Sequence, residues 1–187
     1  TPLQSVTHDS RRSTQGTLFC CVPGEHLDGH DFAPQAVAAG ASALLVEREL
    51  PLPVPQVVVS RVEDALGYAA AGVYGMPSEH LRMIAVTGTN GKSSTTYLLR
   101  SILERSGMTC GLLGTIVYHD GAEEHWADRT TPQAPDVQYW LGRMVSSGSK
   151  ACVLEASSHG LVQGRLKGCS FDGAIFTNLT QEHLDYH

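Results

Sequence analysis

The sequence has no long apolar run, no paired-cysteine motif and no excess of positive charge, and each absence excludes a class of protein. No apolar stretch approaches the roughly 18 residues that a membrane-spanning helix needs. The five cysteines form no C-x-x-C pair, which argues against a zinc ribbon or a disulfide framework and favours a reducing cytoplasm. Lysine and arginine number 13 against 19 acidic residues, so a basic nucleic-acid-binding face is not expected.

The composition is otherwise that of a globular protein, with 42% hydrophobic and 17% charged residues, so a packed core is expected. At about 100–200 residues per domain, 187 residues accommodate one domain or two small ones. No basic region followed by an apolar one opens the chain, so no signal peptide is expected. The turn-forming stretch Gly75-Met76-Pro77-Ser78 is the best candidate for a domain boundary.

Apolar runs of strand length alternate with helical patterns on both sides of this boundary. Strands are expected over residues 17–22, 43–46, 57–59, 83–87, 110–117, 151–154 and 173–177. Helices are expected over residues 32–39, 92–106 and 137–145, and residues 120–133 are polar and irregular. Ser60 and Glu63 have the spacing of a capping box, which predicts one more helix, ending near Tyr74. The alternation predicts an α/β fold with a mainly parallel sheet.

The clearest candidate site is the segment 86–94, Val-Thr-Gly-Thr-Asn-Gly-Lys-Ser-Ser, which follows an expected strand and opens an expected helix. Its glycines let the backbone approach a phosphate chain, which rests on backbone amides and the helix N-terminus. Lys92 would neutralise β/γ-phosphate charge, and the Ser93 hydroxyl would bind Mg²⁺. A strict P-loop has glycine where Val86 stands, so the segment is a variant, and a glycine-rich turn without a ligand is the alternative.

Polar residues at later strand ends are less specific. Glu155 follows an apolar strand and is placed either to hold Mg²⁺ beside the loop or to cap the helix expected near Ser157. His183 follows the expected strand 173–177, and a single histidine is more often structural than a ligand. Gln163 and Arg165 by themselves are typical of a surface pair. Polar residues around tight turns in the first 32 residues are typical of structural turns.

Taken together, these segments resemble the Mur ligase family, and within it the MurE type, over nearly the whole chain. The loop 88–93, Gly-Thr-Asn-Gly-Lys-Ser, is shared by all Mur ligases and by folylpolyglutamate synthases. The order D-S-R, G-T-L-F, D-G and F within residues 9–32 narrows the resemblance to the MurE and MurF types. The segments 155–165 (EASSHGLVQGR) and 176–187 (FTNLTQEHLDYH) are similar to the MurE type specifically.

The resemblance implies a role for each matching residue. ATP would be bound by Gly88, Thr89, Asn90, Gly91, Lys92, Ser93 and Ser94. The substrate would be bound by His8, Ser10, Glu25, His26, Leu27, Thr130, Thr131, Ser157, Gln163 and Arg165. Mg²⁺ would be held or supported by Ser93, Glu155 and His183, and the expected catalytic residues are Lys92, Glu155 and His183. Arg129 and Gln133 depart from the residues that are common at their positions in the family.

The resemblance also implies an activity. It is an ATP-dependent ligation in peptidoglycan precursor synthesis, which adds diaminopimelate or L-lysine to UDP-N-acetylmuramoyl-L-Ala-D-Glu through an acyl phosphate. Residues 1–79 would form the UDP-substrate-binding domain and residues 80–187 an incomplete ATP-binding domain of P-loop type, with the C-terminal domain absent. Such a protein is cytoplasmic and has no nucleic-acid or membrane partner.

Two alternatives to this activity stay open. One is a folylpolyglutamate-synthase-like ligase, and the other is a truncated chain that only binds substrate. The family's carbamylated lysine lies beyond the position that matches His187, so this chain alone is expected to bind the nucleotide-sugar substrate better than it catalyses.

Overall fold

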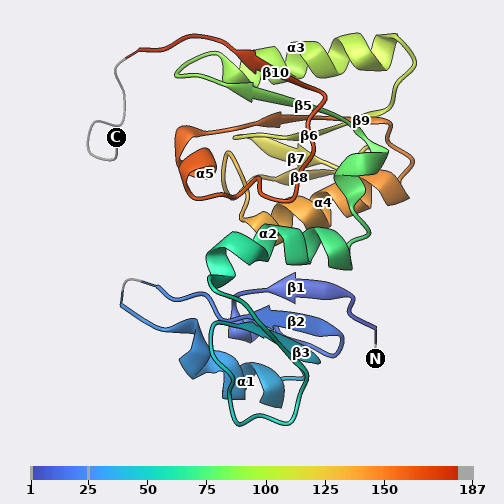
Figure 1. The fold of residues 1–187 in the computed structure, drawn as a ribbon. Helices are drawn as coiled ribbons and strands as arrows, with labels where there is room; N and C mark the ends of the chain where they lie inside the picture. Colours follow the sequence, from blue (N-terminus) through green and yellow to red (C-terminus); the bar gives the residue numbers. More distant parts are fainter. Residues whose placement is uncertain (1, 25, 181–187) are drawn as a thin grey trace. The chain divides into compact units, whose positions relative to one another are not determined.

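The computed structural model describes residues 2–24 and 26–180. The chain divides into two compact units, with the boundary between Gly75 and Met76. That division falls within the Gly75–Ser78 stretch that the sequence singles out. Each unit is an α/β structure with its own sheet, which confirms the predicted fold class (Figure 1).

The first unit is built on a four-stranded parallel sheet in the order β1-β2-β3-β4. The strands are β1 (Ser5–Thr7), β2 (Thr17–Cys20), β3 (Ala43–Val46) and β4 (Gln56–Val58). The helices are α1 (Ala33–Ala38) and α2 (Val62–Val73), with short 3-10 turns η1 (Ser10–Arg12) and η2 (Gly29–Phe32). Every residue of β2 and β3 is buried, which is typical of central strands in a parallel sheet. Val57 and Val58 on the edge strand β4 are more than half exposed.

The capping box predicted for the start of α2 is wrong. The residue that precedes the helix is Arg61, and its side chain makes no capping hydrogen bond. The free amide of Val62 instead donates to a carboxylate oxygen of Glu47, 2.8 Å away, while Glu63 pairs with Arg61. A carboxylate from the end of β3 therefore satisfies the helix start, which the local spacing of Ser60 and Glu63 could not reveal.

The second unit is built on a six-stranded sheet in the order β10-β5-β9-β6-β7-β8. Its strands are β5 (Arg82–Thr87), β6 (Cys110–Leu113), β7 (Val117–His119), β8 (Glu124–Trp126), β9 (Ala151–Glu155) and β10 (Gly173–Phe176). Its helices are α3 (Lys92–Arg105), α4 (Ala134–Ser146) and α5 (Ser158–Val162), and η3 (Pro77–His80) is a 3-10 turn. The four strands from β10 to β6 are parallel, and β7 and β8 are antiparallel.

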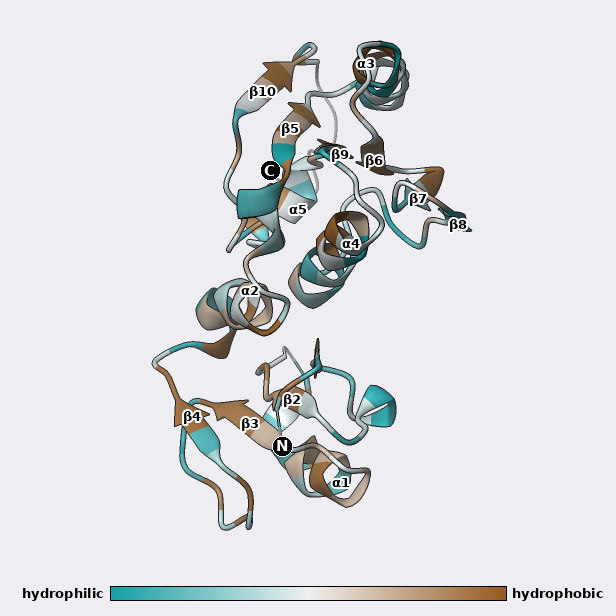
Figure 2. Ribbon diagram, turned by 90° about the vertical axis from the view of Figure 1, so that its right-hand side faces the viewer, coloured by the Kyte–Doolittle hydropathy of each residue, from teal (hydrophilic) through white to brown (hydrophobic). Residues whose placement is uncertain are grey.

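The central strand β9 separates two apolar layers, because successive side chains of a strand point to opposite faces. Cys152 and Leu154 pack in the cluster that contains residues of α4, whereas Ala151 and Val153 pack in the cluster that contains residues of α3. The two helices accordingly cover opposite faces of the sheet (Figure 1), and its strands β10, β5 and β6 are coloured largely as hydrophobic in Figure 2. By the same alternation, Glu155, which follows Leu154 in β9, lies on the face of the sheet that α3 covers.

Two predictions about the middle of this unit are wrong. The expected single strand 110–117 is a pair of antiparallel strands, β6 and β7, because the chain turns back at Gly114, whose N–H donates to the Val117 carbonyl oxygen 3.2 Å away. The expected irregular segment 120–133 contains β8. A tight turn joins β7 to β8, in which the Asp120 carboxylate accepts from the amides of Ala122 and Glu123.

Gly29 and Gly72 give a matched test of packing in the first unit. A Cβ atom on Gly29 would lie 2.5 Å from the Val22 carbonyl oxygen and 2.6 Å from the Val22 nitrogen, so backbone would have to move. Gly29→Ala is therefore expected to destabilise the unit by about 1–3 kcal/mol, as overpacked sites do. Gly72 in α2 meets nothing within 4 Å, so Gly72→Ala is expected to stabilise by about 0.5–1 kcal/mol. Amide hydrogen exchange of β2 and β3 measures both, and equal effects of the two changes would contradict the packing.

Candidate functional site

The segment 88–91 is a tight loop between the carboxyl end of β5 and the start of α3. Gly88 and Gly91 have positive φ angles of 125° and 84°, which strongly favour glycine. A Cβ atom on Gly88 would overlap the Thr177 hydroxyl and the Asn178 backbone. The first turn of α3 has no acidic residue and no side-chain cap within the described part of the chain, so its free amides face the loop side, where an anion would be stabilised.

Lys92 lies at the start of α3 and folds back over the loop. Its ammonium donates to the carbonyl oxygens of Gly88, 2.7 Å away, and Thr89, 2.9 Å away. The lysine therefore holds the loop in shape and places a positive charge beside the free helix amides. This is the position that the sequence predicts for a phosphate-binding lysine.

The loop is braced by the end of the neighbouring strand β10. The Thr177 hydroxyl donates to the Asn90 carbonyl oxygen at 2.7 Å, and the Asn178 side chain both donates to that oxygen and accepts from the Asn90 amide at 3.0 Å. The sequence motifs include Thr177 and Asn178 in the segment similar to the MurE type but give neither residue a role. The signal was available, because the carboxyl ends of parallel strands share one edge of a sheet.

Glu155 ends β9 on the α3 face and is almost fully buried. The Ser93 hydroxyl donates to its Oε2 at 3.1 Å, and the Thr115 N–H donates to its Oε1 at 3.0 Å. Its carboxylate does not cap the next helix, because the Ser157 hydroxyl does so by accepting from the Gly160 amide at 3.1 Å. The helix-cap interpretation of Glu155 is therefore wrong, and its carboxylate lies beside the loop.

The segment around Thr130 and Thr131 lies against the same strand end. The Thr131 hydroxyl donates to the Glu155 carbonyl oxygen at 2.8 Å and accepts from the Ser157 amide at 2.9 Å. Arg165 donates to the Thr131 carbonyl oxygen at 2.8 Å and also to the Gln163 side chain. Four of the predicted substrate residues therefore form one hydrogen-bonded group with Glu155.

The predicted residues of the first unit lie around two turns. His26 and Leu27 are exposed at a turn closed by a 2.8 Å hydrogen bond from the Gly24 amide to the Leu27 carbonyl oxygen. His8 is exposed, whereas Ser10 is buried and its hydroxyl donates to the Gln35 side chain at 3.1 Å. Glu25 and His183 lie outside the described residues.

Asp28 fixes the end of the exposed turn. Its carboxylate accepts from the His30 amide and pairs with Arg48, contacts that hold the pKa of Asp28 well below its usual range. The buried His30 ring accepts the Glu47 amide at Nε2, so its proton is on Nδ1 and is donated to Asp28 at 2.6 Å. The turn that carries His26 and Leu27 is thus tied to β3.

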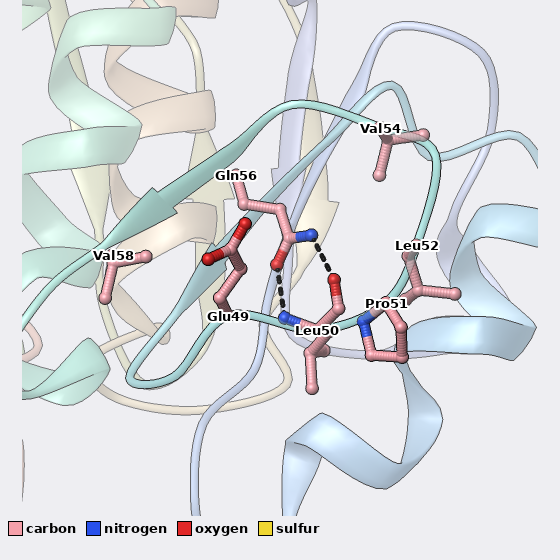
Figure 3. A pocket seen from close by; sticks show the side chains of 7 residues that line it. All are labelled: Glu49, Leu50, Pro51, Leu52, Val54, Gln56 and Val58. Carbon is pink, nitrogen blue, oxygen red and sulfur yellow. Dashed lines mark hydrogen bonds between the residues drawn. The ribbon is translucent and has the colours of Figure 1, made fainter.

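A hollow in the first unit lies at the loop between β3 and β4 (Figure 3). Its lining residues are Glu49, Leu50, Pro51, Leu52, Val54, Gln56 and Val58. The Gln56 side chain accepts the Leu50 amide and donates to the Leu50 carbonyl oxygen, so its polar atoms are engaged in holding the loop (Figure 3). The hollow contains none of the predicted site residues.

The residues at the edge of the second sheet fit a nucleotide and Mg²⁺. The Ser93 hydroxyl and the Glu155 carboxylate are oxygen donors of the kind that Mg²⁺ prefers, and they lie 3.1 Å apart. The loop glycines, the free helix amides and Lys92 are the groups that bind a phosphate chain. Among the described residues, no helix has the length and apolar character required to traverse a bilayer.

Known proteins match the chain along its length. Residues 86–187 match the Mur ligase middle domain, and residues 2–85 match the domain described as "Mur ligase family, catalytic domain". The UDP-N-acetylmuramoyl-L-alanyl-D-glutamate–2,6-diaminopimelate ligase of Geobacillus kaustophilus is 46% identical over 179 residues, which are 96% of this chain and 37% of that protein. The ligase of the same name from Bacillus licheniformis is 42% identical over 185 residues, 99% of this chain and 38% of its own.

A solved structure of a ligase with that name is also similar. It covers 100% of this chain and 38% of its own, with 30% identity and a TM-score of 0.83. The chain thus spans 37–38% of the length of the relatives described here.

Proposed function

The chain belongs to the Mur ligase family, and we propose that its protein is the ATP-dependent ligase that adds 2,6-diaminopimelate to UDP-N-acetylmuramoyl-L-alanyl-D-glutamate in peptidoglycan synthesis. The observation that carries the proposal is the position of Glu155. Its carboxylate meets Ser93 of the phosphate loop, and its backbone meets Thr131 of the segment expected to contact the muramoyl substrate. The groups that would hold the two reactants therefore meet at one strand end.

We assign the nucleotide-sugar end of the substrate to residues 1–79, and the ATP and reacting carboxylate to residues 80–187. In the first domain, His8, His26 and Leu27 are exposed, and the buried Ser10 hydroxyl bonds to the Gln35 side chain. Glu25 belongs to the same expected set. The five cysteines are all free thiols, which supports a reducing compartment such as the cytoplasm.

In the second domain, the first amides of α3 and Lys92 bind and orient the phosphates of ATP. Ser93 and Glu155 hold Mg²⁺, with His183 as a further expected support, and the ion when bound neutralises charge between the two anionic reactants. Thr130, Thr131, Ser157, Gln163 and Arg165 position the carboxylate that receives the γ-phosphoryl group. This transfer leaves ADP and an acyl phosphate, and the amine of the added amino acid then attacks the acyl carbon and displaces inorganic phosphate.

The folylpolyglutamate-synthase-like alternative shares the phosphate loop but not the first unit. Residues 2–85 match a Mur ligase domain, and the similarity to the two diaminopimelate ligases extends over 96% and 99% of the chain, which favours the nucleotide-sugar substrate. L-Lysine as the added amino acid is the remaining alternative within the family, and the names of the relatives favour diaminopimelate.

The activity is tested by phosphate release from ATP by the complete protein. Release is expected only when Mg²⁺, UDP-N-acetylmuramoyl-L-Ala-D-Glu and diaminopimelate are all present, and replacement of diaminopimelate by L-lysine is expected to abolish it. Release with a folate and glutamate would overturn the muramoyl assignment. Calorimetric binding of the nucleotide sugar, without phosphate release for any amino acid, would leave only a binding function.

A further inference from the structure

Thr115 is a residue that none of the sequence motifs singles out, yet it contacts two parts of the candidate site. It lies just after Gly114, at the bend between β6 and β7. Its N–H donates to Glu155 Oε1 at 3.0 Å, and its hydroxyl lies 2.9 Å from Glu155 Oε2. The same hydroxyl lies 3.1 Å from that of Thr130. Thr115 therefore touches both the carboxylate beside the phosphate loop and the segment expected to bind substrate.

The chemistry of these groups gives the hydrogen bonds a direction. An ionised carboxylate only accepts hydrogen bonds, and a hydroxyl has one hydrogen to donate. The single Thr115 hydroxyl proton is therefore donated to Glu155 Oε2, the closer of its two acceptors, and the Thr130 oxygen is the more distant one. Each oxygen of Glu155 then accepts one bond from Thr115, and Oε2 also faces Ser93.

The glycine before Thr115 leaves the space that the Glu155 carboxylate occupies. A Cβ atom on Gly114 would overlap Glu155 Oε1, so only glycine leaves the carboxylate in its place. Glu155 is about 1% exposed, so water does not compete for the oxygens that face Thr115. The two hydrogen bonds from Thr115, with the space that Gly114 leaves, thus fix the orientation of the carboxylate.

We propose that Thr115 is the positioning residue that orients the Glu155 carboxylate toward Ser93 for the binding of Mg²⁺ with the nucleotide. The inference rests on the proposed function, in which Ser93 and Glu155 hold the ion. Residues that hydrogen-bond to a metal ligand set its orientation, and their loss commonly weakens metal binding. Thr115 does so with its backbone and its side chain together.

The test compares Thr115→Val with Thr115→Ser in the complete protein. Valine keeps the branched shape but removes the hydroxyl, whereas serine keeps the hydroxyl. Calorimetry with a non-hydrolysable ATP analogue measures binding at increasing Mg²⁺ concentrations. Thr115→Val is expected to raise the Mg²⁺ concentration for half-maximal binding by about tenfold or more, because a hydrogen bond to a charged group is lost. Thr115→Ser is expected to stay within about twofold of the wild type.

Gly114→Ala supplies an independent variant, because it displaces the carboxylate without removing a polar group. It is expected to raise the Mg²⁺ requirement in the same direction as Thr115→Val, and thermal unfolding without ligand verifies that both variants are folded. An unchanged Mg²⁺ requirement in folded Thr115→Val, or an equal increase in Thr115→Ser, would overturn the positioning role. A wild-type protein without Mg²⁺-dependent nucleotide binding would instead overturn the proposed function itself.

Discussion

Replacement of Lys92 by alanine is expected to lower the rate of ADP formation by about a thousandfold, the range seen when a preorganised charge-stabilising group is removed. The ammonium is the only side-chain cation among the described residues that bonds to the 88–91 loop, where it contacts the Gly88 and Thr89 carbonyl oxygens. Its loss removes positive charge from the phosphate site and loosens the loop. Binding of UDP-N-acetylmuramoyl-L-Ala-D-Glu is expected to stay nearly intact, because its expected contacts lie elsewhere.

The measurement is ADP formation at saturating substrates, together with calorimetric binding of the nucleotide sugar. Lys150→Ala is the matched control, because Lys150 is exposed and lies at the opposite end of β9 from Glu155. It is expected to change neither quantity. A loss of nucleotide-sugar binding equal to the loss of rate in Lys92→Ala would indicate that the lysine serves the fold of the unit and not the phosphates.

Replacement of Glu155 by glutamine is expected to lower the rate about a hundredfold or more, because the charge is removed while the size of the side chain is kept. The amide oxygen can still accept from the Thr115 N–H, and the Ser93 and Thr115 hydroxyls can turn to accept from the new NH₂ group. The fold is therefore retained, and the defect is expected as a higher Mg²⁺ requirement for ADP formation.

Glu79→Gln is the control for Glu155→Gln, because Glu79 is an exposed carboxylate in η3. The two variants are compared by ADP formation as a function of Mg²⁺ concentration and by thermal unfolding. If Glu155→Gln retained the wild-type rate and Mg²⁺ requirement, the carboxylate would have no part in holding the ion.

The parts of the site that were predictable from sequence are those whose residues are neighbours in the chain. The strand, glycine loop, Lys92 and helix all lie within 82–105, so their order alone indicates a phosphate site. Glu155 was recognised because it ends an apolar strand, and strand ends share a sheet edge. The sequence leaves open whether Glu155 caps the next helix or faces the loop, and the Ser157 hydroxyl, which caps that helix in the structure, decides between the two.

The parts that were missed depend on partners far away in the chain. Thr115 bonds to Glu155 across 40 residues, and Asn178 bonds to Asn90 across 88. Glu47 displaces the expected cap of α2 from 15 residues away. Such pairings cannot be read from local spacing. The strand-like composition of residues 110–117 likewise does not reveal the reversal at Gly114.

The alternation of side chains along β9 makes the position of Glu155 sensitive to the length of the strand. The odd-numbered residues of this strand face α3, and its even-numbered residues face α4. Removal of one residue would carry Glu155 to the wrong side of the sheet and exchange the two apolar layers. A change of length by one residue is therefore expected to be tolerated in the connecting turns and not between Ala151 and Glu155.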